Sequence, residues 1–291
     1  MAMNQPVPSL QGGSPQQPKL LAGVKNIIAV ASGKGGVGKS TVAVNLAMVL
    51  AETGASVGLL DADIYGPSLP LMIGICERPT ADPRTGLLTP LEKHGLRLMS
   101  MGFISDAKTA VIWRGPMVHK MITTFMGQVD WGTLDYLVMD LPPGTGDAQL
   151  TITQTAPLTG AVIVTTPQDV SLIDARKGLL MFQQVNVPVL GIVENMSYFV
   201  CDECGKRHEI FRHGGGRRAS EELGVPFLGE VPLDPRVTLG GDQGAPVVTF
   251  APDSPASQAL REVARKLIAQ LEATASQRAP LPTLDLTGIG K

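Results

Sequence analysis

The feature that most constrains the fold of this chain is the stretch Gly33-Lys34-Gly35-Gly36-Val37-Gly38-Lys39-Ser40. It fits the phosphate-binding pattern G-x-x-x-x-G-K-[ST] at every fixed position. A short apolar run, residues 26–31, precedes it, and residues 40–53 follow with apolar side chains at helical spacing. A loop between a buried strand and a helix brings backbone N–H groups and a helix N-terminus to phosphate oxygens. The motif therefore predicts a nucleotide site within an α/β fold.

The residue types of the loop also predict their tasks. Glycines let backbone N–H groups close around phosphate oxygens. Lys39 is expected to reach the β- and γ-phosphates of ATP, and the hydroxyl of Ser40 to hold Mg²⁺. The residues of the loop expected to bind nucleotide are Gly33, Gly35, Gly36, Val37, Gly38, Lys39, Ser40 and Thr41.

Apolar runs that alternate with helical stretches continue along the chain. Because such alternation forms a parallel sheet with right-handed crossovers, it predicts a doubly wound, mostly parallel sheet covered on both faces. The expected strands are residues 26–31, 56–60, 96–101, 134–139, 160–167, 187–193 and 227–231, and a last helix is expected over residues 254–273.

Composition divides the chain into three parts. Residues 1–23 are rich in Gln, Pro, Gly and Ser and are expected to form a disordered tail. Residues 24–273 are expected to form the ATPase domain, which includes the C-x-x-C motif. Residues 274–291 contain two prolines and are expected to form a loose C-terminal tail.

Charge and cysteine content limit the compartment and the partners. The 291 residues carry a formal net charge of −2, whereas binding to nucleic acid usually shows as a basic excess. No apolar run reaches membrane-spanning length, and the first residues lack the apolar core of a signal peptide. Three cysteines, two of them in one short motif, do not suggest a disulfide framework. We therefore expect a cytoplasmic protein with neither nucleic acid nor a membrane as partner.

Carboxylates follow two of the expected strands. Asp61 and Asp63 come after the second strand, and Asp140 ends the strand that precedes a Pro-Pro-Gly turn. The carboxyl ends of parallel strands form the edge where such sheets bind ligands. Carboxylates beside a phosphate loop can hold a Mg²⁺ shell or orient an attacking water, although Asp61 and Asp63 alone could also be turn residues. The Pro-Pro-Gly turn at residues 142–144 is expected to act as a switch that senses the γ-phosphate.

Two further segments are expected to surround the base. Asn195 follows the strand at residues 187–193, where its amide could read adenine, although an isolated Asn is more often a turn residue. Pro232, Leu233 and Asp234 follow the last strand and could form the other wall of the pocket.

Three expectations concern packing. A helix that opens near residues 113–116 is expected to bury a face made of Met117, Met121, Ile122 and Phe125. Ser171 is expected to cap a later helix. Cys76 is expected to be a small buried hydrophobe.

Residues 201–204, Cys-Asp-Glu-Cys, form a possible metal site, with His208 and His213 close behind. Two thiolates can serve one metal centre. The gap from Cys204 to His208 is too short for the usual zinc finger, in which about twelve residues intervene. A thioredoxin-like redox pair would open a helix, whereas the Gly-Lys-Arg that follows is more typical of a knuckle.

Lys34 narrows the class of ATPase. A cation directly after the first glycine cannot easily reach the phosphates of its own nucleotide, but it could reach a nucleotide on a facing subunit. The loop resembles the deviant phosphate loop of the MinD/nitrogenase-iron-protein class of dimerising ATPases. That resemblance implies that Lys34 acts in trans, that Lys39 and Asp63 complete the catalytic set, and that Asp63 positions the attacking water.

A larger set of motifs, taken together, is similar to that of the Mrp/ApbC family. They are the phosphate loop, residues 61–68, 113–116, 140–147 and 194–197, and the C-x-x-C, within a match over residues 24–273. The resemblance implies a cytosolic, homodimeric ATPase that carries iron–sulfur clusters to client apoproteins. It also implies that Cys201 and Cys204 of two subunits bridge one [4Fe–4S] cluster. The chain lacks the small N-terminal domain of many bacterial members and the N-terminal cysteine cluster of eukaryotic scaffold relatives, so neither is expected to recognise clients.

The residues themselves agree with this stoichiometry. A four-iron cluster needs four thiolates, the motif supplies two, and a symmetric dimer supplies four. Two rival functions stay open: a MinD/ParA-like positioning ATPase, which needs a basic or amphipathic surface helix, and a regulatory ATPase stabilised by zinc.

Overall fold

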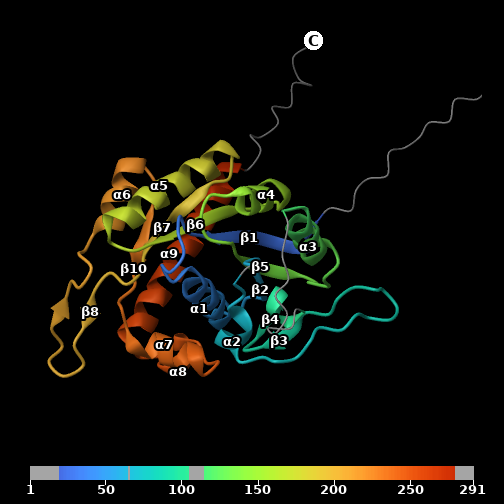
Figure 1. Cartoon of the computed structure of the whole chain (residues 1–291), viewed down its shortest axis with the longest axis horizontal. Coiled ribbons are helices and arrows are strands. Elements are labelled where there is room, and N and C mark those ends of the chain that lie inside the picture. The colour runs from blue at the N-terminus through green and yellow to red at the C-terminus, as the bar shows by residue number, and fades with distance from the viewer. Residues whose placement is uncertain (1–19, 65, 105–114, 279–291) are drawn as a thin grey trace, which may run out of the picture.

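The computed structural model describes residues 20–64, 66–104 and 115–278 (Figure 1). The predicted tails lie largely outside this part of the chain, as do Trp113 and Arg114. In chain order the elements are β1 (Val24–Ala31), α1 (Lys39–Glu52), β2 (Val57–Asp61), α2 (Leu69–Ile73), β3 (Leu91–Lys93), β4 (Leu96–Ser100), a 3-10 turn (Met101–Phe103), α3 (Gly115–Gly127), β5 (Leu134–Asp140), α4 (Asp147–Thr155), β6 (Gly160–Thr165), α5 (Asp169–Gln184), β7 (Val189–Glu194), β8 (Phe199–Val200), β9 (Arg207–His208), α6 (Gly215–Leu223), β10 (Phe227–Glu230), α7 (Pro235–Asp242), α8 (Val247–Phe250) and α9 (Pro255–Arg278).

One sheet of eight strands forms the centre of the molecule, in the order β10-β7-β6-β1-β5-β2-β4-β3. Neighbouring strands are parallel except β3, which runs antiparallel to β4 at one edge. The doubly wound, mostly parallel sheet predicted from the sequence is confirmed. The antiparallel strand β3 was not expected, because it lies in a proline-containing stretch that looked like a surface excursion.

Helices cover both faces of the sheet (Figure 1). Helices α1, α2, α8 and α9 share one hydrophobic cluster with the strands, and α3, α4, α5 and α6 share the other. Strands β2 and β6 are buried along their whole length, as strands covered on both faces must be. No helix in the described part of the chain has the length and apolar character needed to cross a membrane.

The topology brings the sequence motifs to one edge of the sheet. Strand β1 lies between β5 and β6, and the chain returns from β1 through α1 to β2 on the far side of β5. In the register of the strands, Asp61 is the partner of Asp140, and Asp140 is also the partner of Val30. The two carboxylates therefore end adjacent strands beside the phosphate loop, at the point where doubly wound sheets bind ligands.

Helix α3 does not bury the face that its methionines suggested. Met117 is 46% exposed, whereas Val118, Ile122, Phe125 and Met126 are buried. These four follow the i, i+4, i+7, i+8 spacing of a single helical stripe, and Met117 falls outside it.

Three other local expectations were wrong. Helix α5 begins at Asp169 after Gln168, so Ser171 lies within its first turn and its hydroxyl lies 2.7 Å from that of Thr166. Cys76 is exposed, because it follows α2 on a surface loop. Helix α9 continues to Arg278, five residues past its expected end.

The burial of α1 yields a stability prediction. Leu46 is fully buried between α1 and the sheet, so Leu46→Ala should lower the free energy of unfolding by about 2–5 kcal/mol. Leu71→Ala is the matched control, because Leu71 is 62% exposed and should change it by less than about 0.5 kcal/mol. Urea unfolding followed by circular dichroism measures both. Equal losses in the two variants would contradict this account of the core.

Candidate functional site

The phosphate loop joins the end of β1 to the start of α1. At two of its positions, any side chain larger than that of glycine would clash with neighbouring atoms. A Cβ at Gly33 would lie 2.2 Å from the backbone of Asp174, and one at Gly38 would lie 2.2 Å from Nδ2 of Asn195. Gly38 also has a φ of 80°, and no side chain caps the start of α1. The helix end is therefore available to an anion.

Lys39 forms the centre of the site. It is 6% exposed, and its Nζ lies 2.5 Å from Oδ1 of Asp140, 3.3 Å from Oγ of Ser40 and 4.0 Å from Oδ2 of Asp63. A buried ammonium is tolerated only with such partners. The fold thus gathers the lysine, the hydroxyl and the two carboxylates that the sequence analysis selected separately.

Asp61 organises the loop that follows β2. Its carboxylate accepts hydrogen bonds from the backbone N–H of Asp63 at 3.0 Å and of Leu69 at 3.3 Å, and from the hydroxyl of Ser100 at 2.9 Å. Burial, together with the neighbouring charge of Asp140, raises the pKa of Asp61 to about 7. Burial also raises the pKa of Asp140. Two adjacent carboxylates therefore compete to be ionised.

A cavity of about 100 Å³ lies beside the start of α1 and contains the residues expected around the base. Thr41, Asn195, Pro232 and Leu233 all line it. Asp234, the third residue of the predicted wall, lines it too. We call this space the base cavity.

The amide of Asn195 contacts the phosphate loop. Its Nδ2 donates a hydrogen bond to the carbonyl of Val37 at 2.8 Å, and the side chain is buried. The end of β7 is therefore fastened to the phosphate loop through this amide. The role of Asn195 in reading adenine stays a prediction.

A larger cavity, of about 620 Å³, lies beside Asp63. Asp63 and Gly66 line it from one side, and Pro142, Pro143 and Gln149 line it from the Pro-Pro-Gly turn and α4. Gln149 is 1% exposed, and neither its Nε2 nor its Oε1 has a hydrogen-bond partner among the described residues. A buried amide without partners is unusual and marks this cavity as a place where polar contacts are still to be made.

Lys34 is half-buried at the start of the loop, where its own carbonyl accepts a hydrogen bond from the hydroxyl of Ser32 at 2.8 Å. Within the described residues, its ammonium forms no ion pair. Its action on the nucleotide of a facing subunit stays a prediction.

The cysteines lie in a small hairpin that projects from the sheet (Figure 1). Strands β8 and β9 pair antiparallel, the N–H of Cys201 donates to the carbonyl of Lys206 at 3.0 Å, and the N–H of Gly205 donates to the carbonyl of Cys201 at 2.8 Å. Hydrogen bonds from the N–H groups of Cys204 and Glu203 lower the pKa of the Cys201 thiol. The motif is a knuckle and does not open a helix, so its geometry favours metal binding over a thioredoxin-like redox pair.

The two histidines do not complete a metal shell with the cysteines. In the described part of the chain, no group of three or more His, Cys, Asp and Glu side chains could hold a metal ion. Instead, Nε2 of His213 lies 2.9 Å from Oε2 of Glu230, and His208 pairs with Phe199 across the hairpin. Among the described residues, the hairpin therefore offers two thiols without a third ligand.

Comparison with known proteins agrees with this geometry. The model of the ParA group described as "NUBPL iron-transfer P-loop NTPase" matches residues 23–268. The chain belongs to this family. It is 54% identical to the iron-sulfur cluster carrier protein of Synechocystis over 90% of this chain and 77% of that protein. It is 48% identical to the iron-sulfur cluster transfer protein NUBPL of Dictyostelium discoideum over 90% of this chain and 83% of that protein.

Solved structures show the same fold. A nucleotide-binding protein from Archaeoglobus fulgidus, in complex with ADP, is 39% identical, with a TM-score of 0.70 over 80% of this chain and 90% of that one. The cell division ATPase MinD of Pyrococcus furiosus is 22% identical, with a TM-score of 0.65 over 84% of this chain and 99% of that one. The MinD-like fold expected for this NUBPL-family chain is therefore confirmed.

Two buried polar residues were not predicted individually from the sequence. Gln149 lies on α4, and nothing in the local sequence separates it from an ordinary surface residue. Glu194 is fully buried and accepts hydrogen bonds from the hydroxyl of Ser197 and from N–H groups at the start of α6.

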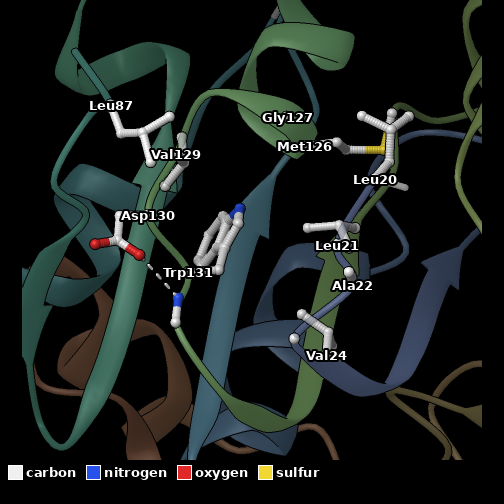
Figure 2. A pocket seen from close by; sticks show the side chains of 12 residues that line it. Leu20, Leu21, Ala22, Val24, Leu87, Met126, Gly127, Val129, Asp130 and Trp131 are labelled. Atoms are coloured by element: carbon white, nitrogen blue, oxygen red, sulfur yellow. Dashed lines mark hydrogen bonds between the residues drawn. The ribbon is translucent and has the colours of Figure 1, made fainter. Parts of the chain in front are cut away.

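Another cavity, of about 240 Å³, lies at the opposite edge of the sheet, where β1 begins (Figure 2). Its walls are mostly apolar, and Leu21, Met126 and Trp131 project around it (Figure 2). The carboxylate of Asp130 already accepts a hydrogen bond from the N–H of Gly132 at 3.2 Å, and the indole N–H of Trp131 donates to a backbone carbonyl at 2.9 Å. The converging charged groups expected of an ATPase site are at the phosphate loop instead.

The environment of Asp61 predicts a pH dependence of stability. Its pKa is about 7 in the folded protein against 3.8 ordinarily. The stability that this protonated carboxyl contributes is therefore complete below about pH 4 and is lost as the pH rises toward 7. Asp61→Asn should flatten the fall in unfolding free energy between pH 4 and 7, measured by urea unfolding without Mg²⁺ or nucleotide. Asp242→Asn, at an exposed position, should keep the parental slope. An unchanged slope in Asp61→Asn would show that other groups cause the fall.

Proposed function

We propose that this protein binds and hydrolyses ATP, holds a [4Fe–4S] cluster between two copies of the chain, and passes the cluster to apo iron–sulfur proteins. The observation that carries the proposal is the hairpin beside the base cavity, which presents two thiols without a third ligand among the described residues. A four-iron cluster needs four thiolates, and a two-fold dimer doubles the two of each chain. The relatives from Synechocystis and Dictyostelium, an iron-sulfur cluster carrier protein and an iron-sulfur cluster transfer protein, support the carrier role.

ATP is proposed to bind with its phosphates at the start of α1. The ammonium of Lys39, now held by Asp140 and Asp63, would then contact the β- and γ-phosphates. Asp63 is proposed to orient the attacking water, since it lies beside Lys39 and lines the larger cavity. The proposed trans role of Lys34 supplies positive charge that only a closed dimer completes.

The residues present fit Mg²⁺. Oγ of Ser40 and Oδ1 of Asp140 lie 3.3 Å and 2.5 Å from Nζ of Lys39, so hydroxyl and carboxylate oxygens converge beside the phosphate loop. Mg²⁺ prefers oxygen ligands and usually keeps several waters. Ser40 would hold the ion and Asp140 a water in its shell, with Asp61 behind them. When bound, the ion would neutralise charge on the β- and γ-phosphates.

The rival functions have weaker support. A positioning ATPase needs a free basic or amphipathic surface. On α9, Arg261 pairs with Glu52, and Arg265 and Lys266 pair with Glu262. These cations are therefore largely neutralised within the chain. A zinc-stabilised knuckle needs four ligands in one chain, and the histidines do not join the cysteines.

The first test separates ATP binding from hydrolysis. Lys34→Ala should bind ATP within about twofold of the parent and hydrolyse it about a hundredfold more slowly, because a stabilising charge is lost only from the transition state. Lys25→Ala, at an exposed lysine near the opposite end of β1, is the control and should keep both properties. Nucleotide titration and phosphate release measure the two steps. Parental hydrolysis by Lys34→Ala would remove the trans role.

The second test concerns the cluster. After anaerobic reconstitution, the parent should be a dimer with about four irons and four sulfides. Cys201→Ser and Cys204→Ser should each lose them. Cys76→Ser and the double variant His208→Ala/His213→Ala should keep them. Iron and sulfide analysis with native mass spectrometry gives the answer, and a stoichiometric zinc ion on a monomer, lost with the histidines, would overturn the carrier function.

A further inference from the structure

The base cavity and the cysteine hairpin are parts of one hydrogen-bonded unit. Asn195 and Met196 line the cavity, and the chain runs from them directly into β8. The opposite wall pairs with this segment: the N–H of Ser197 donates to the carbonyl of Val231 at 3.0 Å, and the N–H of Leu233 donates to the carbonyl of Tyr198 at 2.7 Å. A displacement of either cavity wall is therefore passed to the base of the hairpin.

A side-chain bridge extends this connection into the C-x-x-C loop. Asp234 is 5% exposed in the cavity wall, and its Oδ1 accepts hydrogen bonds from Nε of Arg236 at 2.7 Å and from the N–H of Arg236 at 3.0 Å. The other end of the same guanidinium lies 3.2 Å from Oδ1 of Asp202. Asp202 stands between Cys201 and Cys204, so one rigid side chain joins the cavity wall to the loop that carries both thiols.

The carboxylate of Asp234 has an unused oxygen. Its Oδ2 is buried and has no hydrogen-bond partner among the described residues, although the residue lines the base cavity. A buried carboxylate oxygen without a donor is unfavourable. A donor group of a bound nucleotide that reached Oδ2 would satisfy it, fix Asp234, and with it fix Arg236.

We propose that Arg236 is a positioning residue that couples occupancy of the base cavity to the order of the C-x-x-C loop. A nucleotide in the cavity holds Asp234, Asp234 holds Arg236, and Arg236 holds Asp202, so the two thiols are pre-organised to bind the cluster. This regulation rests on the proposed function for its cluster half. Since coupling between two binding sites is reciprocal, the cluster must strengthen nucleotide binding by the same factor.

The size of the coupling follows from the bridge. The guanidinium of Arg236 is about one-third exposed and the carboxylate of Asp202 about two-thirds exposed. A partly exposed ion pair shifts an equilibrium by up to about fivefold. We therefore expect the cluster-loaded dimer to bind ADP about three to five times more tightly than the cluster-free protein.

Three variants test the bridge. Arg236→Gln and Asp202→Asn should each reduce the ratio of the two ADP affinities to about one, while ADP still binds and the iron content stays parental. Arg236→Lys keeps the charge but loses the planar guanidinium that contacts both carboxylates. Its ratio of ADP affinities should therefore lie between one and the parental value. Fluorescent ADP, titrated anaerobically into the loaded and cluster-free forms, measures the ratio.

Arg207→Gln is the matched control. Arg207 lies on the same hairpin, pairs with Glu230 at 3.2 Å and lies over the ring of Tyr198. In the described part of the chain, no hydrogen bond or ion pair joins it to Asp202 or Asp234. This variant should keep the parental ratio. A parental ratio of one, an unchanged ratio in Arg236→Gln, or an equal loss in Arg207→Gln would each overturn the proposal, the last because it would show general weakening of the hairpin.

A measurement without the cluster separates this proposal from the carrier function. In cluster-free protein, saturating ADP should slow amide hydrogen exchange at residues 201–205, where N–H groups of Cys201 and Gly205 close the loop. The effect should vanish in Arg236→Gln and remain in Arg207→Gln. If ADP leaves exchange unchanged in the parent, the coupling is wrong even where the cluster is bound and transferred. If the parent takes up no cluster but ADP still protects the loop, the carrier function fails and the bridge stands.

Discussion

The buried ion pair of Lys39 and Asp140 is the interaction on which the nucleotide site depends. The two residues are 101 positions apart in the chain, yet their side chains meet at 2.5 Å with almost no exposure to solvent. They meet because α1 starts where β1 ends, and β5 lies next to β1 in the sheet. Neither charge could be buried alone, so the pair requires the strand order, and the strand order places the phosphate loop beside the carboxylates. Asp61 ends β2, the strand on the other side of β5, and lies beside Asp140. Its pKa is raised because it is buried and because the charge of Asp140 is close.

Asn195 connects the end of β7 to this centre. Its hydrogen bond to Val37 spans 158 positions and fastens the end of β7 to the phosphate loop. The preceding residue, Glu194, accepts hydrogen bonds from backbone N–H groups at the start of α6. The chain between β7 and α6 forms the cysteine hairpin, so both ends of this segment are fastened together. The hairpin is therefore short, exposed at its tip and anchored at its base next to the base cavity.

Much of the fold and the phosphate site could be predicted from the sequence because local patterns determine them. Strands buried on both faces appear as apolar runs, and the loop glycines, Lys39 and the strand-end aspartates have fixed spacings. Other features depend on partners distant in the chain. Asn195 donates to Val37, and Arg236 contacts Asp202. Both contacts depend on how segments distant in the chain are arranged in the fold, which no local pattern encodes. Met117 was misplaced for a related reason, since composition suggested an apolar face but only packing selects which stripe faces the sheet.

In the described part of the chain, three side chains have buried polar atoms without a hydrogen-bond partner. They are His94, in the turn between β3 and β4, Gln149, which lines the larger cavity, and Asp234, which lines the base cavity. Elsewhere at the site, buried polar groups such as Asp61 and Glu194 are held by several donors each. Buried polar groups without partners reduce stability, so Gln149 and Asp234 leave polar capacity in the walls of two cavities. Asp63, which lies 4.0 Å from the ammonium of Lys39, lines the larger cavity, and Thr41 of α1 lines the base cavity, so both groups lie next to the site that the Lys39–Asp140 pair organises.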